Sequence, residues 1–203
     1  IEAHGSEDKQ SLVLNKGSIR WLELEPSLRE LNVSTKCNLI VVMATCFGAF
    51  ASAAISLLDR APFWGIIGPE TTTSGPQILS SLTNFYTAIY SGDNSKKLLE
   101  SLNSYPVESQ LKLMTCEWFF IKAYRYYIHN YCNEKVLDER VIRVKKRILL
   151  QGAKAIPDDK EVLEFLRPKG RLQFEAWLNN FFMVDLFPEN VNKISAEYEE
   201  IDL

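Results

Sequence analysis

The sequence predicts an α/β fold in which a mostly parallel sheet is flanked by helices and is followed by an α-helical extension. Two short apolar runs, residues 39–43 and 63–67, lack the alternation of apolar and polar residues that marks a strand with one solvated face. They therefore favour strands buried on both faces. Helical segments, 49–58 and 76–90, follow the two runs, and strands that alternate with helices are typical of a parallel sheet covered on both sides.

The first residues predict the end of a strand, a turn and a hairpin. Residues 1–3 are expected to end a strand, and His4-Gly5 is expected to form the turn after it. Apolar runs around a glycine-containing turn predict a hairpin over 12–14 and 18–21. The leucine spacing over 22–32 predicts a short amphipathic helix.

Helical periodicity alone is recognisable in the second half of the chain. Apolar residues between 111 and 128 recur at intervals of three and four, which predicts one long helix. Three more helices are expected over 134–151, 158–166 and 172–184. We therefore divide the chain into an α/β region, residues 1–105, and a helical extension, residues 106–203.

The composition argues against several classes of protein. With 203 residues, of which 46% are hydrophobic and 24% charged, the chain is long and apolar enough for a globular core. Its net charge of −3 gives no electrostatic reason to expect a nucleic acid as partner. The four cysteines form no Cys-x-x-Cys pair, so neither a zinc site nor a disulfide framework is expected, and a reducing cytoplasm is favoured.

One segment imitates a membrane span. Residues 38–58 are about 20 consecutive uncharged residues, the length that a bilayer-spanning helix needs. The first half is rich in β-branched residues and the second in alanine and serine, so a strand followed by a helix is favoured over one continuous helix. No secretory signal peptide is recognisable after Ile1. We expect no association with a membrane.

Two residues that can carry chemistry are each predicted to follow a strand: His4 and Cys46. Loops at the carboxyl ends of parallel strands converge on a crevice, so the two side chains would meet there if their strands are neighbours. The imidazole could then take the proton of the thiol, and the thiolate could attack a carbonyl carbon. Gly5 would let the main chain approach closely, so the amides of Gly5 and Cys46 are the expected oxyanion donors.

This pattern resembles the caspase-like (clan CD) cysteine peptidases, including the CHAT domains, over about the first half of the chain. The matching motifs are Ala3-His4-Gly5 and Ala44-Thr45-Cys46-Phe47-Gly48, and residues 84–92 resemble a helix of the bacterial relatives. The resemblance implies a cysteine endopeptidase that needs no cofactor, a protein or peptide substrate and a regulatory protein partner. Bacterial relatives often act in signalling or antiviral defence. The family's sheet begins with two further strands, so residues 1–105 would lack the first strands of that sheet.

Substrate selection does not follow from the resemblance. Caspases that cut after Asp carry Gln two residues before the nucleophile and metacaspases carry Asp, whereas Ala44 supplies neither a charge nor a hydrogen bond. Glu70 and Thr71, in the loop after the second apolar run, are the candidates to line a substrate pocket with Ala44. The same loop could instead cap the helix that begins near Pro76.

Other interpretations of the same residues stay open. A cysteine after a buried strand is often only a small core residue, and His4 could have a purely structural role. The chain would then be a catalytically inactive caspase-like scaffold that binds a protein partner through its helical half. An amidase or thioesterase is another alternative. His129 and Cys132 are spaced to share a helical face, but two residues alone make a weak metal site.

Overall fold

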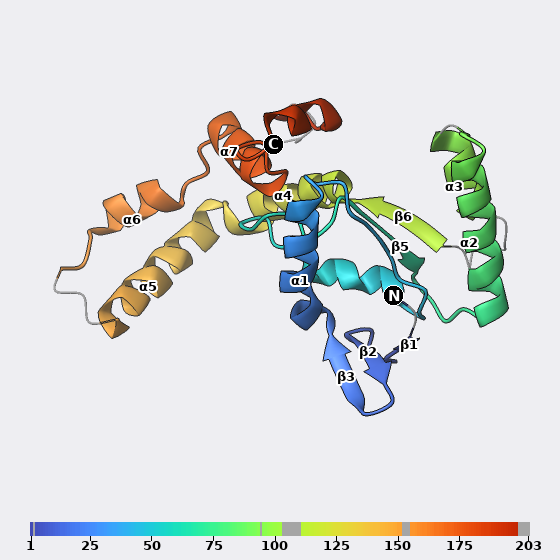
Figure 1. Cartoon of the computed structure of the whole chain (residues 1–203). Coiled ribbons are helices and arrows are strands. Elements are labelled where there is room, and N and C mark those ends of the chain that lie inside the picture. Colours follow the sequence, from blue (N-terminus) through green and yellow to red (C-terminus); the bar gives the residue numbers. More distant parts are fainter. Residues whose placement is uncertain (2, 94, 103–110, 152–154, 199–203) are drawn as a thin grey trace.

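A computed structural model describes the whole chain except residues 2, 94, 103–110, 152–154 and 199–203 (Figure 1). Two small three-stranded sheets are present, with the orders β1-β2-β3 and β4-β5-β6. The strands are β1 (His4–Gly5), β2 (Ser11–Leu14), β3 (Gly17–Arg20), β4 (Ile40–Val42), β5 (Gly65–Pro69) and β6 (Leu111–Thr115). The predicted boundary near residue 105 lies outside the described residues.

The helices belong to both halves of the chain. They are α1 (Trp21–Ser34), the 3₁₀ helix η1 (Gly48–Ala54), α2 (Gly75–Tyr90), α3 (Ser95–Leu102), α4 (Cys116–Tyr131), α5 (Glu134–Leu150), α6 (Asp159–Leu166), α7 (Arg171–Phe181) and the 3₁₀ helix η3 (Pro188–Lys193). The helices predicted over 22–32, 76–90, 134–151, 158–166 and 172–184 are confirmed to within about three residues at each end.

The prediction of a caspase-like, mostly parallel sheet is wrong. Only β4 and β5 form a parallel pair in the described part of the chain, and the other three pairs of strands are antiparallel. One reason is His4–Gly5, which was expected to be the turn after a strand over 1–3 but forms the strand β1, paired antiparallel with the predicted hairpin instead of extending a parallel sheet. The other is β6, an antiparallel neighbour of β5 where one long helix was expected. Within 111–115 the apolar spacing fits a strand as well as a helix, so periodicity could not separate the two.

The two central strands are parallel, as their apolar runs predicted, but only β5 is buried along its whole length. Ile40 of β4 is 43% exposed, so that strand is not covered on both faces. The expected α-helix over 49–58 is the shorter η1, closed by bonds three residues apart such as Ile55 N–H to Ser52 O at 3.1 Å. Its alanines are small enough to pack directly on β5, where the Gly68 backbone approaches Gly48 and Ala49.

One main hydrophobic core joins the two halves of the sequence. Met43 and Phe63 from the first half pack in the same buried cluster as Phe120, Phe174 and Phe181 from α4 and α7. The ring of Phe120 lies 5.4 Å from each of the rings of Phe174 and Phe181, within the range of favourable aromatic pairs. The helical extension therefore completes the main hydrophobic core.

Smaller contacts hold the loops around this core. Asn32 of α1 is fully buried; its amide donates to Ala61 O at 2.9 Å, and its oxygen accepts from Leu39 N–H at 3.0 Å. It thereby links α1 to the segments that lead into β4 and β5. Figure 1 shows α5 and α6 extending away from the body on one side, while α2 and α3 lie on the other.

Residues 38–58 do not form a continuous helix, since β4, a turn and η1 occupy them. Among the helices in the described residues, none combines the length and the apolar character needed to cross a bilayer.

Candidate functional site

The segment that contains Cys46 is a tight turn between β4 and η1. The amide of Gly48 donates to Thr45 O at 3.0 Å, and Phe47 adopts a left-handed conformation with φ of 58°. A side chain other than glycine is uncommon in that region of backbone space and costs about 1 kcal/mol or more. The turn is therefore held by its surroundings, and it presents the half-buried thiol of Cys46 at the end of the strand.

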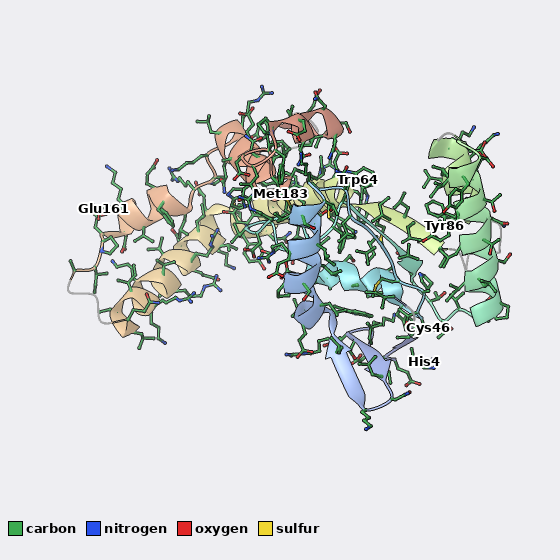
Figure 2. All side chains as sticks on the ribbon, in the orientation of Figure 1. His4, Cys46, Trp64, Tyr86, Glu161 and Met183 are labelled. Atoms are coloured by element: carbon green, nitrogen blue, oxygen red, sulfur yellow. The ribbon has the colours of Figure 1, made fainter. Side chains whose placement is uncertain are left out.

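The chain that leads to His4 begins beside β4. The amino group of Ile1 donates to Val42 O at 2.8 Å, and the amide of Ala44 donates to Ile1 O at 2.8 Å. Two bonds that flank one residue in this way have the pattern of a parallel pair of strands. The His4 and Cys46 segments therefore run side by side at this point, and Figure 2 shows the two labelled residues close together near the N-terminus.

Gly5 is the closest point between the two segments. A Cβ built on Gly5 would lie 1.8 Å from the carbonyl oxygen of Cys46 and 2.8 Å from its carbonyl carbon. Only glycine allows the backbones to approach so closely. His4 is thereby fixed, one residue before Gly5, next to the turn that carries the thiol, and its side chain is exposed to solvent.

Thr73 is the residue that contacts the sulfur of Cys46. Its amide N–H lies 3.5 Å from Sγ, and its carbonyl oxygen accepts from the thiol at 3.6 Å. The backbone of Thr73 therefore lies against the sulfur through both its N–H and its carbonyl group. The Oγ1 atom of Thr73 is buried and has no hydrogen-bond partner in the described structure.

Lys9 makes a second contact between the hairpin and the Cys46 turn. Its ammonium lies 5.3 Å from the ring centre of Phe47 and 5.0 Å from that of Phe50, which is the distance of a cation–π interaction. The indole of Trp21 donates to Lys9 O at 2.7 Å and fixes the backbone there. The hairpin thus supports the turn through Lys9 as well as through Gly5.

The three residues expected to bind substrate occupy different surroundings. Ala44 packs against the hydrophobic cluster around Ile67, and Thr71 accepts a hydrogen bond at its carbonyl from Phe47 N–H at 3.2 Å. Glu70 is exposed and forms an ion pair with Lys112 of β6. The same loop also caps α2, as the alternative interpretation predicted. The cap is Ser74, whose amide donates to the side chain of Gln77 at 3.0 Å, and not Glu70.

The other cysteines differ from Cys46 in their surroundings. Cys37 and Cys116 are buried, and burial raises the pKa of both thiols. The thiol of Cys116 also donates to Phe63 O at 2.7 Å. Cys132 is half-buried, and the described residues hold no group of three or more His, Cys, Asp or Glu side chains placed for a metal ion.

Sequence reasoning did not identify Thr73 or Lys9 as parts of this site. Thr73 lies in the same polar loop as Glu70 and Thr71, which were expected to line a substrate pocket. Its contact with the sulfur uses backbone atoms that any residue has. The contact of Lys9 depends on how the β1–β2 loop folds back over Phe47. Neither interaction has a local sequence pattern.

The chain was also compared with known proteins. No protein-family model, no curated protein and no solved structure gives a significant match.

Proposed function

We propose that the chain is a cysteine-type peptidase in which Cys46 is the nucleophile and His4 is its base. The observation that carries the proposal is the close approach of the Gly5 backbone to the Cys46 carbonyl, because it places the backbone segment that carries His4 beside the turn that carries the half-buried thiol. The proposal does not depend on a caspase-like sheet.

The proposed reaction is peptide hydrolysis through a thioester. The His4 imidazole takes the proton from Cys46 Sγ, and the thiolate forms a bond to the peptide carbonyl carbon. When the C–N bond breaks, the imidazolium gives its proton to the leaving amine. Water, deprotonated by the imidazole, then attacks the thioester and releases the acid and the Cys46 thiol. The amides of Gly5 and Cys46 remain the proposed donors to the oxyanion.

Cleavage of a peptide library by wild-type protein and two variants tests this function. We expect cleavage by wild type, none by Cys46→Ala, and a loss of at least about 10²-fold in kcat/KM for His4→Gln, since a positioned base contributes 10²–10⁴-fold. Cys132→Ala is the matched control and should retain activity. Cleavage that survives Cys46→Ala would exclude the proposal.

A protein-binding scaffold is the second candidate, and one observation favours it. Phe165 of α6 and Leu172 of α7 are 78% and 75% exposed, and both line a hollow beside Trp177. Exposed apolar groups that gather around a hollow are typical of interaction sites. If the chain is a scaffold, Cys46→Ala should still bind the protein partner. Phe165→Ser together with Leu172→Ser should abolish that binding.

A further inference from the structure

A groove of about 700 Å³ lies between η1 and α4. Its walls are mainly apolar and include Ala49, Phe50, Ala53, Met114, Trp118 and Phe119. A cavity of this size is in the range that accommodates small-molecule and peptide side-chain ligands. Its apolar walls favour an occupant that brings a large apolar group.

The groove lies close to the Cys46 turn along the chain, since its first lining residue is Ala49. The helix η1 that forms one wall starts at Gly48, and Phe50 in that wall contacts the ring of Phe47 with centres 6.4 Å apart. Glu70 also lines the groove, directly before Thr71, whose carbonyl accepts from Phe47 N–H. An extended chain bound with its scissile bond at Cys46 would therefore meet the groove within a few residues.

The charges in the groove select the chemistry of the occupant. Glu70 is neutralised by Lys112, so it offers no excess negative charge to a basic residue. Lys122 is exposed, lies 4.5 Å from the ring centre of Trp118, and forms no ion pair with a carboxylate of the described chain. Stacking on Trp118 holds the ammonium over the groove, where a carboxylate can reach it.

We propose that this groove binds the peptide substrate of Cys46, taking one bulky apolar side chain between η1 and α4 and a neighbouring acidic residue at Lys122. The inference rests on the proposed peptidase function, and it adds the class of substrate. The apolar walls and Lys122 select the substrate. Ala44, two positions before the nucleophile, takes no part in this selection.

Binding to a Cys46→Ala protein tests the groove separately from catalysis. The probes are fluorescein-labelled Gly/Ser-rich peptides with one Trp and one Glu two residues apart, and versions in which Trp is Ser, or Glu is Gln or Lys. Fluorescence anisotropy gives each Kd. We expect replacement of Trp by Ser to weaken binding about tenfold or more, because a large apolar group is no longer buried. Replacement of Glu by Gln should weaken it roughly two- to fivefold, as for an exposed ion pair.

Two substitutions locate the binding site. Ala53 is exposed and lines the groove, so Ala53→Trp should fill it and weaken binding of the Trp/Glu peptide about tenfold or more without affecting the core. Ala176→Trp, at an exposed alanine in the other hollow, is the control. Lys122→Glu should make the Trp/Lys peptide bind more tightly than the Trp/Glu peptide, whereas Lys135→Glu should not.

The outcomes separate the groove from the catalytic proposal. Equal affinity for all four peptides, or unchanged binding by Ala53→Trp, overturns the groove assignment even if wild type cleaves peptides. Groove-dependent binding to a wild-type protein that cleaves none of these peptides overturns the peptidase function and the substrate assignment with it. Preference for the Trp/Glu peptide in both binding and wild-type cleavage, lost in Ala53→Trp, supports both.

Discussion

Arg60 and Asp185 form a two-point ion pair that joins the loop before β5 to the turn after α7. The two guanidinium nitrogens lie 2.8 and 2.7 Å from the two carboxylate oxygens. Ala61, next to Arg60, donates its amide to Phe181 O at 2.9 Å. The helical extension is thus attached to the sheet by polar contacts beside the shared core.

This pair makes a pH-dependent contribution to stability. The hydrogen bond from Arg60 lowers the pKa of Asp185 below its ordinary value of 3.8. A carboxylate with a lowered folded pKa stabilises the protein above its unfolded pKa, and this contribution is lost as the pH falls through the folded pKa. Asp185→Asn should lower the free energy of unfolding by up to about 1 kcal/mol at pH 7, since the carboxylate is partly exposed.

Urea denaturation of the wild type and Asp185→Asn at pH 7 and below pH 3 measures this contribution. The difference between the two proteins should shrink toward zero at the lower pH. Asp138→Asn, at an exposed position of α5, should match wild type at both pH values. An Asp185→Asn difference that grows on acidification would contradict the assignment.

Gly5→Ala should disrupt the junction between the His4 and Cys46 segments. The added Cβ would lie 1.8 Å from Cys46 O, and backbone atoms on both sides must move to relieve the clash. We expect a loss of about 1–3 kcal/mol in the free energy of unfolding, as for an overpacked core site. Gly75→Ala is the matched control: its Cβ would meet nothing within 4 Å. Thermal denaturation of both variants makes the comparison, and equal melting temperatures would disprove the close contact.

Alkylation should distinguish Cys46 from the two buried cysteines. Burial raises the pKa of Cys37 and Cys116 and shields their sulfur atoms, so both should react slowly with iodoacetamide at pH 7. Cys46 is half-buried and should react faster. Samples of the folded protein quenched over time, digested and analysed by mass spectrometry of the peptides give the rate at each site. His4→Gln should slow the reaction at Cys46 and leave that at Cys132 unchanged; an equal rate in the variant would remove His4 as the base.

Asn32→Ala should be among the most destabilising single substitutions in α1. It removes the partner of Ala61 O and of Leu39 N–H in a fully buried place, and an unsatisfied buried group costs about 1–3 kcal/mol. Asn192→Ala, at an exposed position, should have little effect. Guanidinium denaturation measures the free energy of unfolding of both variants. If Asn32→Ala were as stable as wild type, water would have to replace the lost amide.

Most helices were predictable because each carries a repeating apolar face or a cap. The capping box of Asp158 and Glu161 and the proline after Gly75 mark helix starts that sequence reasoning placed within a residue or two. The pairing of β4 with β5 also followed from two apolar runs. The topology of the sheets did not, because β6 is specified by its contacts with β5, and its own residues suit a helix equally well.

The candidate site was predictable only in part. His4-Gly5 and Cys46 were each expected to follow a strand, which is a local pattern. The structure instead makes His4–Gly5 the strand β1 itself, and it brings Gly5 onto the Cys46 carbonyl. The contacts of Thr73 and of Lys9 depend on loops that meet across long stretches of sequence. Glu70 was expected to line a substrate pocket with a free charge, but it forms an ion pair with Lys112. Lys112 belongs to β6, a strand that was not predicted from the sequence.

The shared core has a consequence for the order in which the protein folds as it is synthesised. Phe63 leaves the ribosome about 120 residues before Phe181, which packs in the same cluster. At about 5–20 residues per second, this interval lasts roughly 6–24 seconds. During that time the part of this core that α4 and α7 complete stays incomplete, so a nascent chain that stalls between the two halves would expose apolar residues to chaperones.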